Sequence, residues 1–301
     1  MVKILTFGEI IWDIYGSDEV LGGAGLNFAA HAGKCGAESA ILSAVGNDKL
    51  GERAVAEISR LGVDTRFLLK NNYETGKCLV TLDGRGIPSY ELLTNTAYDF
   101  IKIGEQEFSE IKNADFDALY FGSLIQRSGE SRATLRKLLT EVSFKDVICD
   151  VNLRKNCYDR ESVLFCLENA TILKISDEEE PLLREMKLYS AEDSTPEKIT
   201  VAIAKKYKNI GCILFTMGER GAYVYESREK RGFYSSPKSA KVISSVGAGD
   251  SFTAAFVTSY LSGNSDESSA ELAAALAAFV VSRKEAIPEY RITNGEITAK
   301  T

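Results

Sequence analysis

Histidine is nearly absent from this chain of 301 residues, which contains only His31. His31 lies in an alanine-rich stretch of helical character, so we expect it to pack rather than to react. A single histidine excludes multi-histidine metal centres and argues against histidine-dependent hydrolysis. The six cysteines form no Cys-x-x-Cys pair and show no metal-type spacing, which is typical of reduced thiols in a cytoplasmic protein.

An excess of positive charge is also missing. Lys and Arg total 36 against 43 Asp and Glu, a net charge of −7, which argues against nucleic acid or an anionic membrane as the main partner. The alanine-rich run Leu272 to Val281 is too short to cross a bilayer. The N-terminal MVKILTFGEI is typical of a strand and lacks the apolar core of a signal peptide. We therefore expect a cytoplasmic protein.

Only five prolines interrupt the chain, and repeats and low-complexity tracts are missing. What is present is an alternation of apolar, strand-like runs with helical segments. Four such runs end in polar or glycine residues, namely 118–121, 147–151, 171–175 and 212–215. The carboxyl ends of parallel strands meet at one edge of an open sheet, where ligands bind. We predict a single α/β domain over residues 1–301.

Residues 75–98 break the alternation. They read as two strands joined by a turn around Asp83 to Gly86. A hairpin inserted into an α/β alternation indicates a lid. We expect this lid to be formed by insertions at about residues 11–22 and 75–99, and it could also pair two subunits in a homodimer.

Two glycine-rich turns lead into helices. Gly22 and Gly23 open the first, which fails the dinucleotide fingerprint because Phe28 occupies the third glycine position. The second, Gly247 to Gly249, is not a P-loop, because Asp250 follows it and no lysine does. A helix N-terminus favours anions, yet Asp250 places a carboxylate there. Taken alone, Asp250 has two equally good explanations. It could be a helix cap, or it could be a base beside an anion hole, the pairing that phosphoryl transfer to an alcohol requires.

Several motifs together resemble the ribokinase-like sugar kinases, also called the PfkB family. VGAGDSF at 246–252 is similar to their C-terminal signature, GGAGLNFAAHAGKCGAESAILSAVGNDKLG at 22–51 to their N-terminal signature, and TMGERG at 216–221 to their nucleotide-binding turn. Gly8-Glu9 through Asp13 resembles their first sugar-contacting segment, and the matches run in family order from residue 8 to residue 288. The resemblance implies a three-layer α/β/α fold with a mainly parallel central sheet and a small β lid.

The resemblance also implies residue roles. Asp250 would be the base that takes the proton of a sugar hydroxyl, and the N–H groups of the preceding turn would stabilise the transferring phosphoryl. Arg154 would face the sugar, although it could instead pair with a carboxylate at a strand end. The implied sets are Gly247, Ala248 and Gly249 for the phosphoryl; Asp13, Gly22, Gly23, Asn27 and Arg154 for the sugar; and Lys174, Ser176, Thr216, Gly218 and Gly221 for the nucleotide.

ATP and Mg²⁺ are the cofactors that the resemblance implies. Glu179 lies at the glutamate of an N-x-x-E signature that organises Mg²⁺ through water, but Ser176 replaces its asparagine. The metal would bind mostly through nucleotide phosphates and water. Ser244 and Glu285 occupy the places where many relatives bind a monovalent cation, so K⁺ activation is not expected.

The sugar is suggested by two segments. DVNLRKNCYD at 150–159 resembles the D-x-N-x-R segment of fructokinases and 2-keto-3-deoxygluconate kinases, while GIPSYELLTNTAYDFI at 86–101 looks more like a fructokinase lid. We favour D-fructose, with 2-keto-3-deoxygluconate or another sugar or nucleoside as the alternative and a phosphorylated sugar as less favoured. A sugar- or nucleotide-binding regulator without turnover would be marked by loss of Asp250 or of the Gly-Ala-Gly turn, and both are present.

Overall fold

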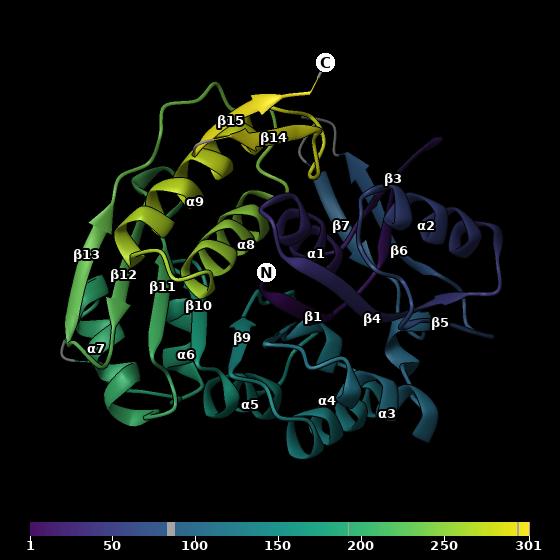
Figure 1. Ribbon diagram of the computed structural model, residues 1–301, viewed down its shortest axis with the longest axis horizontal. Helices are drawn as coiled ribbons and strands as arrows, with labels where there is room; N and C mark the ends of the chain where they lie inside the picture. Colours follow the sequence, from purple (N-terminus) through teal and green to yellow (C-terminus); the bar gives the residue numbers. More distant parts are fainter. Residues whose placement is uncertain (83–87, 192, 294, 301) are drawn as a thin grey trace.

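A nine-stranded sheet forms the centre of the computed structural model, which describes residues 1–82, 88–191, 193–293 and 295–300 (Figure 1). Its strands are β1 (Lys3–Phe7), β4 (Glu38–Gly46), β5 (Leu68–Asn71), β8 (Ala118–Gly122), β9 (Asp146–Asp150), β10 (Ile172–Ser176), β11 (Cys212–Thr216), β12 (Ala222–Glu226) and β13 (Arg231–Ser235). They are ordered β13-β12-β11-β10-β9-β8-β1-β4-β5. All neighbours from β11 to β5 pair in parallel, whereas β12 and β13 are antiparallel. The sheet is therefore mainly parallel, as predicted.

Helices cover both faces of this sheet (Figure 1). One layer contains α1 (Ala24–Lys34), α2 (Lys49–Arg60), α8 (Ala248–Leu261) and α9 (Asp266–Val281), and the other contains α3 (Glu105–Asn113), α4 (Gly129–Glu141), α5 (Arg160–Asn169), α6 (Glu180–Glu185) and α7 (Pro196–Lys206). Successive strand residues face opposite layers. Leu119 and Phe121 of β8 pack with α4 and α5, while Tyr120 packs with α1 and α8. The predicted three-layer architecture is confirmed.

A second sheet stands apart from the first. It has the order β3-β2-β6-β7 and is built from β2 (Ile11–Tyr15), β3 (Asp18–Gly22), β6 (Gly76–Leu82) and β7 (Pro88–Leu92). The turn expected around Asp83 to Gly86 lies outside the described residues. Short 3-10 turns η1 (Ala97–Phe100), η2 (Leu124–Gln126) and η3 (Gly218–Arg220), and a C-terminal hairpin of β14 (Tyr290–Thr293) and β15 (Glu296–Ala299), complete the elements.

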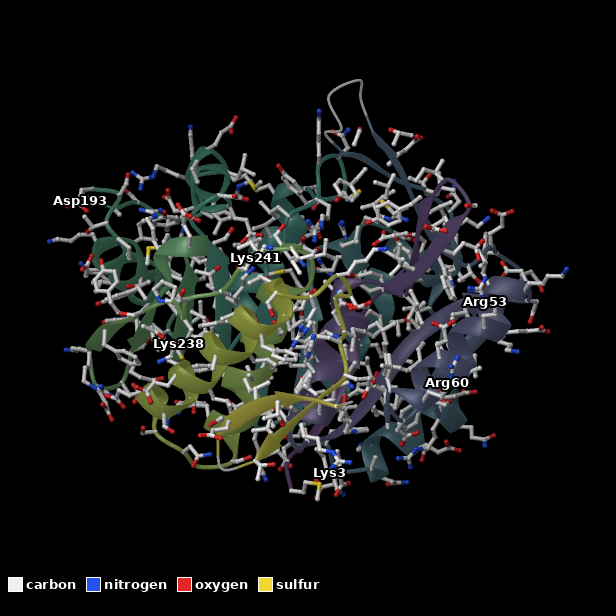
Figure 2. All side chains as sticks on the ribbon, turned by 90° about the horizontal axis from the view of Figure 1, so that it is seen from above. Lys3, Arg53, Arg60, Asp193, Lys238 and Lys241 are labelled. Carbon is white, nitrogen blue, oxygen red and sulfur yellow. The ribbon has the colours of Figure 1, made fainter. Side chains whose placement is uncertain are left out.

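Many charged side chains lie at the surface, and most cysteines lie in the core. Figure 2 shows charged side chains such as Arg53 and Arg60 of α2 at the periphery. All six cysteines are unpaired, and five of them are buried. Among the residues that the structure describes, no helix combines the length and the apolarity needed to cross a bilayer.

Strand register places polar side chains in one row beneath α8. Lys174 pairs with Asp150 and Ser176 with Thr216 across neighbouring parallel strands. Asp150, Ser176 and Thr216 are the last residues of β9, β10 and β11, and α8 begins above them. The row therefore lies at the carboxyl edge of the sheet, as the sequence predicts.

Candidate active site

The N-terminus of α8 carries Asp250. Gly247, with φ of 80°, is the N-cap, and no side chain caps this helix end. A Cβ at Gly247 would lie 2.7 Å from the carbonyl oxygen of Ala286, so the turn requires glycine both for its backbone angle and for space. Asp250 lies three residues after the N-cap, so the reading of Asp250 as a simple N-cap is wrong.

Asp250 is buried and bonded to a residue far away in sequence. Asn27 Nδ2 donates to Asp250 Oδ2 over 2.8 Å. Burial raises the pKa of Asp250, while the Asn27 hydrogen bond and the charges of Arg154 and Lys174 oppose that rise. A desolvated carboxylate with one fixed donor has a free lone pair for a hydroxyl proton, which is what a general base needs.

One donor of the predicted anion hole already has a partner within the chain. Ala248 N already donates to Ser245 O, but over a long 3.3 Å. That bond would have to be exchanged before Ala248 could bind a phosphoryl oxygen.

The residues predicted for the sugar lie around Asp250. A Cβ at Gly22 would be 3.8 Å from Asn27 Oδ1 and 3.9 Å from Asp13 Oδ2, so Gly22 leaves the space between these two groups open. Burial raises the pKa of Asp13, and Arg154 opposes the rise. The charge of Arg154 also opposes the rise in the pKa of Asp250, and the Arg154 side chain itself is exposed. Asn27 Oδ1 is buried without a hydrogen-bond partner in the described structure and is free to accept from a ligand.

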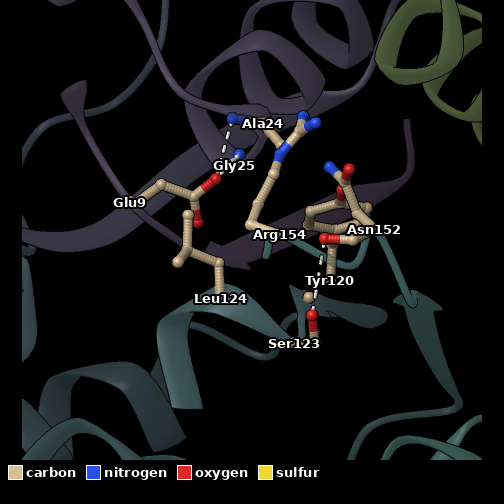
Figure 3. Close-up of a pocket in the computed structure, with 9 residues that line it drawn as sticks. Glu9, Ala24, Gly25, Tyr120, Ser123, Leu124, Asn152 and Arg154 are labelled. Carbon is tan, nitrogen blue, oxygen red and sulfur yellow. Dashed lines mark hydrogen bonds between the residues drawn. The ribbon is translucent and has the colours of Figure 1, made fainter. Parts of the chain in front are cut away.

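Glu9 and Tyr120 lie beside the predicted residues, although neither is among the site residues assigned from the sequence, where Glu9 only falls within the segment Gly8 to Asp13 that resembles a sugar-contacting segment. They line a cavity of about 10 Å³ together with Asn152 and Arg154 (Figure 3). This volume is about enough for one water molecule. The Tyr120 ring stacks on Phe28 at 3.7 Å, and its hydroxyl is buried without a partner in the described residues. The only sequence signal for Tyr120 was a hydroxyl in an otherwise apolar strand, a pattern that equally fits the core.

Glu9 sets the position of α1. Its Oε1 accepts from Ala24 N at 2.8 Å and from Gly25 N at 3.4 Å, and thereby caps a helix whose N-cap residue, Gly23, has no side chain (Figure 3). A carboxylate at this position is favoured by the helix dipole. Since α1 also carries Asn27, Glu9 indirectly fixes the donor to Asp250.

The residues predicted for the nucleotide end neighbouring strands. Glu179 Oε2 accepts from Ser176 N at 2.7 Å and from Ser176 Oγ at 2.9 Å, while its Oε1 accepts from Leu153 N at 2.8 Å. Glu179 therefore ties the end of β10 to the segment that carries Arg154. Lys174 Nζ lies 2.9 Å from Asp150 Oδ1. Lys174 also borders α8, because a Cβ at Gly249 would be 3.8 Å from its Nζ.

The turn after β11 is a tight glycine turn. Gly218 and Gly221 have φ of 56° and 85°, and a Cβ at Gly221 would lie 2.2 Å from Ser235 O. Met217 N closes the turn by donating to Gly221 O over 2.8 Å. Thr216 pairs with Ser176 across the two strands, so this turn follows directly from the same strand end.

Glu179, Ser244 and Glu285 are the residues that bear on metal and monovalent cation binding. In the described part of the chain, no three His, Cys, Asp or Glu side chains gather into a metal site. Ser244 Oγ accepts from Val246 N at 3.2 Å, and Glu285 is exposed.

His31 packs, as expected: its Nε2 donates to Ala286 O at 2.9 Å, and its Nδ1 accepts from the Tyr290 hydroxyl at 2.7 Å. Burial lowers the pKa of His31 to about 4.

Comparisons with known proteins agree with this geometry. Residues 16–292 match the model of the pfkB family carbohydrate kinases. A Pyrococcus horikoshii protein described as a sugar kinase is 31% identical over 195 residues, which cover 58% of this chain and 62% of that protein. The ATP-dependent 6-phosphofructokinase of Thermoanaerobacterium thermosaccharolyticum is 25% identical, covering 92% of this chain and 87% of that one.

The fold is shared with solved sugar kinases. The fructokinase of Vibrio cholerae, in its fructose, ADP and calcium ion bound form, superposes with a TM-score of 0.79 over 95% of each chain at 21% identity. The family match spans both glycine turns, Asp250 and the strand ends described above. This chain therefore belongs to the pfkB family of carbohydrate kinases.

Proposed function

We propose that this protein transfers the γ-phosphoryl of ATP to a hydroxyl of a small monosaccharide, with D-fructose as the favoured substrate. The observation that carries the proposal is the buried Asp250 carboxylate, held by Asn27 in the first turn of α8 beside the Gly247 cap. A base and an anion site within one helical turn suit an in-line displacement.

The proposed reaction divides the site into two sides. On the sugar side, Asp250 accepts the proton of the attacking hydroxyl, while Asp13, Asn27 and Arg154 bind other hydroxyls of the sugar across the space left by Gly22 and Gly23. On the phosphoryl side, N–H groups of Gly247, Ala248 and Gly249 bind oxygens of the group in transfer. Each such donor contributes about 3 kcal/mol in comparable oxyanion sites.

Mg²⁺ and ATP enter together in this proposal. Each carboxylate oxygen of Glu179 already accepts at least one hydrogen bond from the chain, which fits contact with the metal through water rather than direct ligation. The nucleotide lies along Lys174, Ser176, Thr216, Gly218 and Gly221, and the metal neutralises phosphate charge as the bond to ADP breaks.

The four-stranded sheet supports two further parts of the proposal. Its strand β2 carries Asp13, and β3 ends at Gly22, so closure of this sheet as a lid over the sugar would exclude water. The same sheet could pair two subunits. Unpaired cysteines support a cytoplasmic location.

Fructose is favoured by the Asp150-Val-Asn-Leu-Arg154 segment and by the position of Arg154 among carboxylates on the sugar side. A guanidinium can bind the hydroxyls of a neutral ketose or the carboxylate of a sugar acid, so 2-keto-3-deoxygluconate stays as the alternative. The phosphofructokinase relative makes fructose 6-phosphate a required member of the test panel.

The experiment is an ADP-release assay with ATP and Mg²⁺ against fructose, ribose, tagatose, 2-keto-3-deoxygluconate, fructose 6-phosphate and nucleosides. Saturable turnover with fructose at the highest kcat/KM is the expected result, and the Asp250→Asn variant should be nearly inactive on the same sugar. Tight sugar binding without turnover across the whole panel would instead establish a binding regulator.

A further inference from the structure

Lys174 is a buried ammonium with carboxylate neighbours. It is the third residue of β10 and faces α8, and only 8% of its side chain is exposed. Its Nζ lies 2.9 Å from Asp150 Oδ1 and 3.9 Å from Glu179 Oε2. Burial lowers the pKa of Lys174, but the charges of Asp150, Glu179 and Asp250 raise it by more. The side chain is therefore a fixed positive charge.

The N-terminus of α8 adds partial positive charge beside this ammonium. A Cβ on Gly249 would lie 3.8 Å from Lys174 Nζ, so the ammonium sits beside the first turn of α8. That end of a helix carries partial positive charge and repels a cation. A positive side chain and a helix N-terminus aimed at one place are both stabilised when an anion binds between them.

Lys174 is the cation that lies beside the Asp150 carboxylate. Asp150 is fully buried, and its Oδ1 lies 2.9 Å from Lys174 Nζ. An ammonium has three N–H groups, so this contact with Asp150 does not use all of them. The remaining N–H groups can donate to a second anion without giving up the first.

We propose that Lys174 is a catalytic residue whose ammonium donates to a non-bridging oxygen of the γ-phosphoryl during transfer, and that Asp150 is the positioning residue that holds it there. The inference rests on the proposed function. As the bond from the γ-phosphorus to the sugar oxygen forms, the bond to the β–γ bridging oxygen breaks and its electron pair leaves with ADP. The hydroxyl proton goes to Asp250, and Lys174 keeps its protons throughout.

The test compares the affinities for ATP and ADP by calorimetry without sugar. A Lys174→Met variant should lose about 10-fold or more of its ATP affinity, the loss expected for one hydrogen bond to a charged group, while ADP affinity stays within about twofold. With sugar, kcat should fall by about 100-fold or more, as for loss of one phosphoryl-binding donor. Lys174→Arg should recover part of both. Lys145→Met, which removes an exposed lysine paired with Asp117, is the matched control.

Removal of Lys174 alone leaves Asp150 buried without compensation and could unfold the protein. The double variant Asp150→Asn with Lys174→Met removes both charges, so ATP and ADP affinities can still be measured if the single variant does not fold. Asp150→Asn alone should weaken ATP binding, and it should add little when Lys174 is already Met.

Equal losses of ATP and ADP affinity, or no loss of either, would overturn the proposal. Because the binding measurement needs no sugar, its outcome is independent of whether any sugar is phosphorylated. Turnover that is insensitive to Lys174 would reject this inference and leave the proposed function intact.

Discussion

Replacement of Asn27 by alanine should move the acid limb of the pH–rate profile upward. Asn27 donates to Asp250 over 2.8 Å in a buried setting, and this bond is the largest of the contributions that lower the pKa of Asp250 against the effect of burial. The base works only when deprotonated. A higher pKa therefore means that kcat begins to fall at a higher pH.

The size of the shift follows from the hydrogen bond. A hydrogen bond to a charged group contributes about 1.5–3 kcal/mol, and one pKa unit corresponds to about 1.36 kcal/mol. Part of the bond persists when the acid is protonated, so we expect a shift of about one to two units. At saturating sugar, the alkaline plateau of kcat should stay within a few fold of the wild-type value, because the carboxylate itself is retained.

The assay is the pH dependence of kcat, followed by ADP release from about pH 5 to pH 9. Asn71→Ala is the control, because Asn71 Nδ2 donates to the backbone oxygen of Ala97 at 2.9 Å in the scaffold. Asn27→Asp should give a larger shift, since two carboxylates at this distance share one proton. An acid limb that coincides in wild type and Asn27→Ala would refute the view that this bond sets the pKa of the base.

Three further results are expected. Asp250→Asn should lower kcat by about 100- to 10,000-fold with KM values within a few fold, and retained turnover would reject Asp250 as the base. Arg127→Met should destabilise the protein by about 3–5 kcal/mol in urea unfolding, because Arg127 forms a buried pair with Asp99 at 2.7 Å and also donates to Leu93 O at 2.7 Å; a smaller loss would mean that Asp99 finds other partners. Exchange of K⁺ for Na⁺ should change the rate little, because Ser244 and Glu285 occupy the two places where many relatives bind a monovalent cation and Ser244 offers no carboxylate. A steep K⁺ requirement would show that other groups of the chain bind the cation.

The sequence predicted local structure correctly where a residue type strongly favours one backbone conformation or one environment. Gly247 before Asp250 predicted a helix N-terminus, and the structure gives Gly247 a φ of 80° at the cap. Apolar runs with polar ends predicted the parallel strands. By contrast, the antiparallel strands β12 and β13 and the C-terminal hairpin were not predicted, because short segments such as Ala222–Glu226 give little periodicity to read.

Contacts between distant residues were beyond the reach of local patterns. Asn27 and Asp250 are 223 positions apart, so the amide that controls the pKa of the base could be named only as a sugar ligand. Glu9 caps a helix that begins 15 residues later. The pairing of Asp150 with Lys174 depends on strand register, which a single sequence does not specify.

The burial of charge explains why the two sides of the site should bind different ligands. Burial raises the pKa of Glu9, Asp13 and Asp250, so hydrogen-bond donors such as sugar hydroxyls would relieve the cost of desolvation on that side. Lys174 and the N-terminus of α8 present positive charge on the other side and favour phosphate oxygens. A phosphate bound beside Asp13 and Asp250 would bring like charges together. In the proposed reaction, the same electrostatics that make the empty site costly would orient both substrates for transfer.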